Sequence, residues 1–344
     1  MRISLIGSNL LFLLAKLAIV SSMEVYWNIP SFMCRKHNIL FNNTVTSFGI
    51  KQNDYDNFQG DIISIMYDPG MFPALGNNLE RRNGGIPQEG DIVRHLQEYK
   101  IAVDDLIPDV NNRGLAIIDF ESWRPIFRQN FGSLTPYKDL SLQIERERHP
   151  FWTKSRQQQE AQNRFEAAGR RYVEETIILS KKLRPNALWG YYAFPYCFNK
   201  ESSECPKQVR DENDRMNWMF RFSDLILPSV YLAEQKMSSA ERQRMVKARI
   251  QEAMRFAKMY NKKTYVYIRY VYIDTKNFLS ETDLIMVFQI AKNLKTNGII
   301  LWGSSKDLSS RKLCEKLQTY MDTTMGPIAQ SFSSMRVHVN FVGF

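Results

Sequence analysis

The stretch GLAIIDFESW (residues 114–123) contains an unbroken apolar run that leads into two acidic residues, Asp119 and Glu121. A continuous apolar run is typical of a strand buried on both faces, as in a parallel sheet that helices cover. Alternate residues of a strand share a face, so the two carboxyl groups should point the same way from about 7 Å apart along the chain. The stretch therefore predicts a buried strand with a pair of acids at its carboxyl end.

Six further apolar runs have the same character and alternate with helical stretches. The runs span residues 24–30, 61–70, 187–195, 224–232, 263–272 and 297–304, and the best helical segments span 156–183, 240–260 and 280–298. Alternation of this kind without a Gly/Ser-rich linker predicts one closed (β/α) barrel of about seven strands in a single domain. An open doubly wound sheet is the alternative, but no G-x-G-x-x-G motif follows the first strand.

The chain is basic and begins like a secreted protein. Its 344 residues include 46 Lys and Arg against 36 Asp and Glu, a formal charge of +10 that favours polyanionic partners. Residues 1–22 start with a basic residue, continue into an apolar core and end with small residues at Val20 and Ser22, as a cleaved signal peptide does. The apolar run is too short for a membrane anchor, which needs about 20 residues. We therefore expect secretion after cleavage near Ser22.

Four cysteines in a secreted chain predict two disulfides, for which three connectivities exist. Cys197 and Cys205 are close in sequence, whereas Cys34 and Cys314 lie near opposite ends of the folded region. Pairing of the first two would leave a bond that ties the two ends together. A zinc site would need paired CxxC-like spacings, which the chain lacks. One N-x-S/T sequon predicts a glycan at Asn42.

Aromatic residues gather at the predicted strand ends, where a barrel of this kind places its active site. The ends carry Tyr or Trp, among them Tyr67, Tyr192, Tyr231 and Trp302. Aromatic faces bind sugar rings, and their polar tips can hydrogen-bond hydroxyl groups. Strands also favour these residues for packing alone, so a single one is weak evidence. Their concentration at one end of the barrel favours a carbohydrate site.

The two acids suggest glycoside hydrolysis. Carboxyl groups this close cannot both ionise comfortably, so one of them keeps its proton near neutral pH. Glu121 has the longer reach and is the predicted proton donor, with Asp119 as its tuning partner. Because both approach from one side, the nucleophile must come from elsewhere, and an acetamido group of the substrate can supply it. A buried Asp beside a surface Glu, without any catalytic role, fits the spacing equally well.

Eight motifs in order resemble the hyaluronidases of hymenopteran venom, glycoside hydrolase family 56. They are YWNIPSFMC, YDPGMFPAL, RNGGIPQEG, IDFESWRPIFRQN, HPFW, WGYYAFPYC, LPSVY and LWGSS, and the similarity runs from about residue 25 to 328. The resemblance implies a distorted TIM-like barrel over residues 23–328, followed by a loosely ordered tail at 329–344. It also implies a secreted endo-β-N-acetylglucosaminidase that cuts hyaluronan between N-acetylglucosamine and glucuronate, a polyanion that suits the basic charge.

The resemblance assigns roles to individual residues. Glu121 matches the family's acid/base, and Asp119 matches the acid beside it. The side chains implied around the substrate are Tyr192 and Tyr231 at the acetamido group, Trp302 as the wall of that subsite, and Tyr67 and Arg124 around the cleft. The implied disulfides are Cys34–Cys314 and Cys197–Cys205.

Four residues depart from the family's pattern: Phe131, Arg148, Phe194 and Arg269. They leave the acids and the acetamido pocket intact but affect how the substrate is bound. A hyaluronan-binding homologue with little or no activity is therefore the alternative function. Chondroitin has the same alternation of glucuronate and acetamido sugars and is a second candidate substrate. We expect a monomer without membrane anchor, nucleic-acid partner, metal or cofactor, because the four histidines are scattered and no nucleic-acid motif is present.

Overall fold

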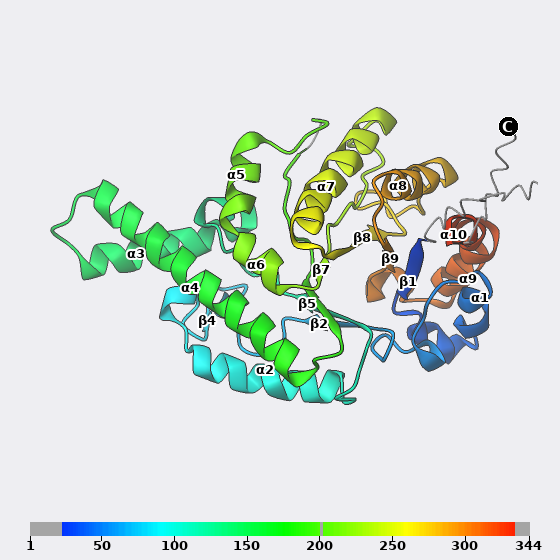
Figure 1. Ribbon diagram of the computed structural model, residues 1–344, viewed down its shortest axis with the longest axis horizontal. Helices are drawn as coiled ribbons and strands as arrows, with labels where there is room; N and C mark the ends of the chain where they lie inside the picture. The colour runs from blue at the N-terminus through cyan, green and yellow to red at the C-terminus, as the bar shows by residue number, and fades with distance from the viewer. Residues whose placement is uncertain (1–22, 200–201, 334–344) are drawn as a thin grey trace, which may run out of the picture.

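Seven parallel strands stand at the centre of the computed structural model, which describes residues 23–199 and 202–333 (Figure 1). They are β1 (Glu24–Asn28), β2 (Ile63–Tyr67), β5 (Leu115–Asp119), β6 (Leu188–Tyr191), β7 (Leu225–Ile226), β8 (Lys263–Arg269) and β9 (Gly298–Trp302). A short antiparallel hairpin, β3 (Ala74–Leu75) and β4 (Arg81–Arg82), lies in the connection after β2. The prediction of seven strands in a closed barrel is confirmed, while the expected signal peptide lies outside the described residues.

The strands follow one another around the barrel in chain order. β2, β5 and β6 pair in parallel, as do β7, β8, β9 and β1. A parallel bridge between Tyr192 and Leu227 joins the two groups. Such parallel strands are expected to be buried on both faces. Because all the strands run in the same direction, their carboxyl ends meet at one rim of the barrel.

The seam between β1 and β2 is closed by the connecting segment rather than by direct strand pairing. Lys51 pairs with β1 through backbone bonds to Val25 and Trp27 of 2.8 Å each. Two residues later, the Asn53 side chain accepts hydrogen bonds from the backbone N–H groups of Ile62 and Ile63 at 3.0 Å. A side-chain amide thus replaces part of a strand ladder, which makes the barrel irregular at this seam.

Alternation along the strands sorts the apolar side chains into an inner and an outer core. Ile63 and Ile65 of β2 and Leu115 and Ile117 of β5 belong to the cluster inside the barrel. The alternate residues of β5, Ala116 and Ile118, face outward and pack under the surrounding helices. Both faces of these strands are buried, which explains their continuous apolar sequence.

The helices surround the strands in the order of the chain (Figure 1). They are α1 (Asn42–Ser47), α2 (Ile92–Leu106), α3 (Thr135–Arg148), α4 (Lys154–Leu183), α5 (Lys207–Arg215), α6 (Asn217–Phe222), α7 (Ser239–Tyr260), α8 (Glu281–Asn293), α9 (Arg311–Tyr320) and α10 (Gly326–Ser333). No helix within the described residues is long and apolar enough to cross a bilayer.

The predicted long helices are present, and their caps explain where they begin. Ser238 caps α7 in a capping box with Glu241, and the Thr153 side chain caps α4. The helix expected at 280–298 ends earlier, at Asn293, and Lys295 then adopts a left-handed conformation with φ of 62°. The chain therefore turns before it reaches the next strand.

Two predicted boundaries differ from the structure. The strand expected at 224–232 is reduced to β7, because Pro228 has no N–H to donate and interrupts the ladder. The expected tail begins too early, since residues 329–333 continue α10. Ala329 in this stretch is fully buried and Phe332 packs on Phe288 at a ring distance of 5.3 Å. The ordered body thus extends to Ser333.

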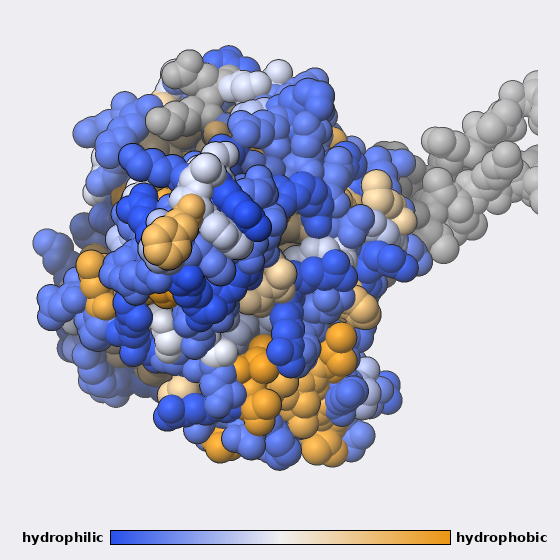
Figure 2. All heavy atoms as spheres, turned by 90° about the vertical axis from the view of Figure 1, so that its left-hand side faces the viewer, coloured by the Kyte–Doolittle hydropathy of each residue, from blue (hydrophilic) through white to orange (hydrophobic). Residues whose placement is uncertain are grey.

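Helices α3 and α4 form a hairpin that projects from the barrel at the left of Figure 1. Its loop carries Phe151, whose side chain is fully exposed. Figure 2 looks onto this side of the molecule and shows a mainly hydrophilic face with a group of apolar residues low on it. Arg148, one of the departures from the family pattern, lies at the end of α3 and pairs with Glu89 at 2.9 Å. This departure therefore belongs to the hairpin rather than to the rim of the barrel.

Both disulfides have the pairing that the resemblance implied. Cys34–Cys314 links the segment after β1 to α9, and these segments are close because β1 and β9 are neighbours. Cys197–Cys205 closes a loop of 8 residues separation after β6. The first bond spans 280 residues and restricts the unfolded chain far more than the second.

This difference predicts a ranking of stability. In the chain-entropy description, removal of a bond costs more for a longer loop, roughly 5 kcal/mol for Cys34–Cys314 and roughly 3 kcal/mol for Cys197–Cys205. The double variant Cys34→Ser/Cys314→Ser should therefore unfold at lower urea concentration than Cys197→Ser/Cys205→Ser. Urea unfolding followed by circular dichroism under non-reducing conditions measures both, and the reverse ranking would contradict this account.

Candidate active site

The two acids lie at the rim formed by the carboxyl ends of the strands. Asp119 is the last residue of β5 and is half-buried, and Glu121 follows on the exposed side. Between and after them, Phe120 and Trp123 are buried in the outer core. Phe120 stacks on Phe72 at 4.0 Å, and the Trp123 indole N–H donates to the Pro73 carbonyl at 2.8 Å. The aromatics anchor the chain outside the barrel and leave both carboxyl groups on its rim.

Burial raises the pKa of both acids, and like charges add to the shift of Asp119. Burial, together with the charges of Glu121 and Asp68, raises the pKa of Asp119 to about 8. Burial also raises the pKa of Glu121, while the Arg124 guanidinium opposes this shift. Asp68 is close because its backbone N–H donates to the Asp119 carbonyl at 2.7 Å. The pair therefore holds a proton at neutral pH, as its spacing in the sequence predicts.

Three aromatic residues form one wall of the site. The Trp302 indole N–H donates to the Tyr67 hydroxyl at 2.8 Å, and the Tyr231 ring stacks on Trp302 with centroids 5.6 Å apart and an interplanar angle of 13°. Tyr67 ends β2 and Trp302 ends β9, so the wall joins distant parts of the chain. We call these three residues the aromatic wall. Its flat faces and polar tips suit a sugar ring with hydroxyl or amide groups.

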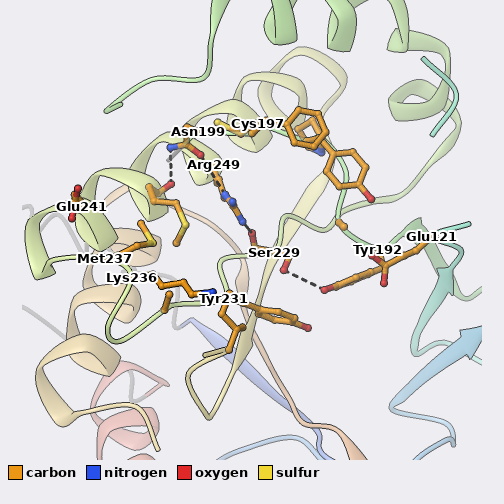
Figure 3. A pocket seen from close by; sticks show the side chains of 17 residues that line it. Glu121, Tyr192, Cys197, Asn199, Ser229, Tyr231, Lys236, Met237, Glu241 and Arg249 are labelled. Atoms are coloured by element: carbon orange, nitrogen blue, oxygen red, sulfur yellow. Dashed lines mark hydrogen bonds between the residues drawn. The ribbon is translucent and has the colours of Figure 1, made fainter. Parts of the chain in front are cut away.

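Glu121, Tyr192 and Tyr231 line one pocket of about 650 Å³ (Figure 3). The Tyr192 hydroxyl donates to the Ser229 hydroxyl at 3.2 Å and points along the pocket (Figure 3). Burial raises the pKa of Tyr192 and of Tyr231, so both keep their hydroxyl protons. The pocket thus offers a carboxyl group and two hydroxyl groups to the same ligand.

Arg124 lies in a cage of aromatic rings beside Glu121. Its guanidinium carbon is 4.6 Å from the Tyr196 ring centroid, 5.0 Å from that of Phe198 and 5.4 Å from that of Phe131. Phe194 is buried and packs on Tyr196 at 4.8 Å. Two of the departures from the family pattern, Phe131 and Phe194, therefore act on Arg124, directly or through Tyr196. Cation–π contacts of this kind fix the orientation of the guanidinium.

The structure brings all the predicted catalytic and substrate-binding residues to one rim, and it adds a residue that the sequence did not single out. Arg249 lies in a charged helical run that reads as a solvated face, yet its side chain is half-buried in the pocket (Figure 3). It donates to the Ser229 carbonyl at 2.9 Å and to the Asn199 side chain at 3.3 Å, and it forms no ion pair with a described carboxylate. Lys236 lines the same pocket. Only tertiary packing directs Arg249 inward, so no local signal could have identified it.

The described histidines do not contribute to the rim. His95 is fully buried, accepts from the Met71 N–H at 3.0 Å and contacts the Thr176 hydroxyl at 2.8 Å. Burial lowers the pKa of His95 to about 3, so it is a neutral core residue. Within residues 23–199 and 202–333, no group of three or more His, Cys, Asp or Glu side chains is placed to hold a metal ion.

Comparison with known proteins identifies the family. The model of glycoside hydrolase family 56, described as hyaluronidase, matches residues 15–336. The chain belongs to this hyaluronidase family. Curated hyaluronidases of Apis mellifera and Vespa magnifica are 43% and 45% identical over 320 and 317 residues. These alignments cover 90% and 89% of this chain and 84% and 88% of the relatives. A hyaluronidase of Tabanus yao is 43% identical over 317 residues, covering 89% of this chain and 90% of that protein, so the similarity is not confined to bees and wasps.

Solved structures of the family share the fold. Bee venom hyaluronidase superimposes with a TM-score of 0.86 and 44% identity over 90% of this chain and 99% of that one. The same enzyme in complex with a hyaluronic acid tetramer gives a TM-score of 0.88 and 42% identity, over 91% of this chain and 100% of that one. The expected distorted TIM-like barrel of the hyaluronidase family is therefore confirmed.

The raised pKa of Asp119 predicts a pH-dependent stability. The folded protein holds this proton up to about pH 8, whereas the ordinary value is 3.8, so the group's stabilising contribution is complete below pH 4 and is lost as the pH rises through 8. Asp119→Asn should remove this loss and be more stable than the parent by roughly 3 kcal/mol at pH 9, with little difference at pH 4. Thermal unfolding across this range measures the effect, with Asp211→Asn on exposed α5 as control. A pH-independent difference would refute the assignment.

Proposed function

We propose that the chain is a secreted hyaluronidase that hydrolyses the β-1,4 bond between N-acetylglucosamine and glucuronate with retention of configuration. The observation that carries the proposal is the position of Glu121, which lines the pocket together with Tyr231 of the aromatic wall and lies close to the second carboxyl group, Asp119. The solved complex of bee venom hyaluronidase with a hyaluronic acid tetramer supports the choice of polymer. The family membership supports the reaction class.

The geometry supports a substrate-assisted mechanism. Asp119 and Glu121 project from one strand end, so they cannot flank the sugar as acid and opposed nucleophile. The other acid that lines the pocket, Glu241, is engaged in the cap of α7 with Ser238. The acetamido carbonyl oxygen of the substrate therefore attacks the anomeric carbon while the glycosidic C–O bond breaks. Glu121 donates its proton to the leaving oxygen.

The second half of the reaction reverses the role of Glu121. The ionised carboxylate takes a proton from water, whose oxygen attacks the anomeric carbon and opens the cyclic intermediate to restore the acetamido group. Two inversions at that carbon give net retention. Asp119 supports both steps, because the pair retains one proton in the free enzyme and Glu121, which reaches the pocket, delivers it.

The tyrosines and the aromatic wall have a positioning role in this mechanism. Tyr192 and Tyr231 bring neutral hydroxyl groups into the pocket next to Glu121, where they can bond to the acetamido group. Trp302 stacks beyond Tyr231 and limits the movement of a sugar ring. An amide oxygen held close to the anomeric carbon converts the attack into an intramolecular step, which can lower the barrier by several kcal/mol.

The cations of the pocket suit a uronate polymer. Arg249 and Lys236 line the pocket and form no ion pair with a described carboxylate. A glucuronate carboxylate can supply the missing counter-charge to each of them. Chondroitin presents carboxylates and acetamido groups in the same alternation, and we propose it as a second substrate. The departures at Phe131 and Phe194 preserve the cage around Arg124, so the site retains the parts of an active enzyme rather than those of a silent binding homologue.

Replacement of the proton donor tests the function. Glu121→Gln should lower the rate of reducing-sugar release from hyaluronan by at least about 10³-fold, because the amide cannot donate a carboxylic proton. Circular dichroism should remain unchanged, and hyaluronan should still be retained in an affinity gel. If the parent protein itself binds hyaluronan without cleaving it, the chain is a binding homologue. If Glu121→Gln cleaves normally, the donor is another residue.

The stereochemical outcome and the charge of the pocket give a second test. Arg249→Gln should raise KM for hyaluronan about tenfold at low salt, because a half-buried charge that binds the substrate carboxylate is lost, and the effect should shrink in high salt. Lys247→Gln removes the same charge from the exposed face of the same helix and serves as the control. Equal effects of the two variants would show that only net charge matters.

Proton NMR of a fresh digest should give the β-anomer first.

A further inference from the structure

Arg269 stands next to Trp302 in the rim of the barrel. It is the last residue of β8, and the strand register pairs it with Trp302 of β9, which in turn pairs with Asn28 of β1. Its guanidinium carbon lies 5.5 Å from the centroid of the Trp302 ring. Arg269 is also one of the four departures from the family pattern.

The guanidinium of Arg269 pairs with one carboxylate through two of its nitrogens. Its Nη2 lies 2.7 Å from both oxygens of Asp307, and its Nε lies 3.2 Å from Oδ2. Only 13% of the Arg269 side chain and 9% of the Asp307 side chain are exposed. A bidentate pair with so little exposure is geometrically rigid, and removal of one partner leaves an uncompensated charge.

Asp307 connects this pair to the backbone that carries Trp302. Its Oδ2 also accepts the Ser304 N–H at 3.0 Å, which starts the short helical turn Ser305–Leu308. The chain between Trp302 and Asp307 is therefore fixed at both ends, by β9 pairing on one side and by the ion pair on the other. Any shift of Asp307 would move the start of this turn and the tryptophan two residues before it.

We propose that the Arg269–Asp307 ion pair is the positioning element of the aromatic wall, holding the Trp302 ring at the tilt that stacks it on Tyr231 and directs its N–H to Tyr67. The inference rests on the proposed function for its activity readout only. The cation packs against one face of the indole while the other contacts of the ring are to Tyr231 and Tyr67. The acetamido group of the substrate is thereby held against a wall of fixed orientation.

Arg269 acts through Trp302 and not by binding the substrate. Its Nε and Nη2 are bonded to Asp307 and the paired charges cancel, so the pair neither attracts a uronate nor opposes the positive charge that develops on the sugar during cleavage. Arg249 differs in this respect, since its bonds go to neutral acceptors. The two arginines at the rim therefore have separate roles, one of which is independent of substrate charge.

The experiment is a double-mutant cycle with two readouts. Arg269→Ala and Asp307→Ala should each lower kcat/KM for hyaluronan about 10²-fold, since a displacement of about 1 Å in a positioning group has that effect. The double variant should lose no more than either single variant, because the two side chains act as one unit. Arg269→Lys keeps one charged contact and should recover part of the loss. Arg164→Ala breaks another half-buried ion pair, between α4 and Glu89 of the turn before α2 at 3.0 Å, and should leave kcat/KM unchanged.

The second readout does not depend on cleavage. Quenching of Trp302 fluorescence by a hyaluronan tetramer is measured in the Glu121→Gln background, with Trp302→Phe to assign the signal. Arg269→Ala should weaken this quenching about tenfold in apparent Kd while Arg164→Ala leaves it unchanged. Additive losses in the cycle, or a lower unfolding midpoint with normal kcat/KM and normal quenching, would overturn the proposal. Loss of cleavage in the parent with normal quenching would instead count against the proposed function alone.

Discussion

The placement of two carboxyl groups at the end of β5, where burial raises the pKa of each, is the constraint on which the site depends. Burial, with the charges of Glu121 and Asp68, raises the pKa of Asp119 to about 8, and burial also raises that of Glu121. The barrel makes this arrangement possible because Phe120 and Trp123 anchor the chain on the outside and leave the acids on the rim. The tyrosines nearby are neutral donors for the same reason, since burial next to anions disfavours a phenolate.

Much of this arrangement could be predicted from the sequence, because it follows from local patterns. Apolar runs gave the strands, cap residues such as Ser238 marked the helices, and the spacing of Asp119 and Glu121 placed two carboxyl groups on one face. The position of Arg249 could not be predicted in this way. Its helical run has an ordinary charge pattern, and only the packing of α7 against the rim turns that one side chain inward. The side-chain closure by Asn53 likewise depends on two segments meeting in space.

Some of the aromatic residues at the predicted strand ends lie at the rim, and others are buried in the core. Tyr67, Tyr192, Tyr231 and Trp302 lie at the rim with the two acids, but Tyr270 and Tyr272 are 1% and 2% exposed and belong to the outer core. Trp27 belongs to the same outer core, where its ring stacks on Phe41 with centroids 5.8 Å apart. For these three, packing preference alone explains the residue type. Which strand-end aromatics face the rim is decided by where each strand stops, and that boundary depends on tertiary contacts.

The aromatic wall connects the two sides of the seam between β1 and β2. Tyr67 belongs to β2 on one side of the seam and Trp302 to β9, beyond β1, on the other, so the hydrogen bond between them spans the irregular part of the barrel. A sugar that contacts both residues would stabilise the barrel at the place where the strand ladder is incomplete. Ligand affinity and the closure of the barrel are then thermodynamically linked, and a loosened seam would reduce sugar binding even with every site residue in place.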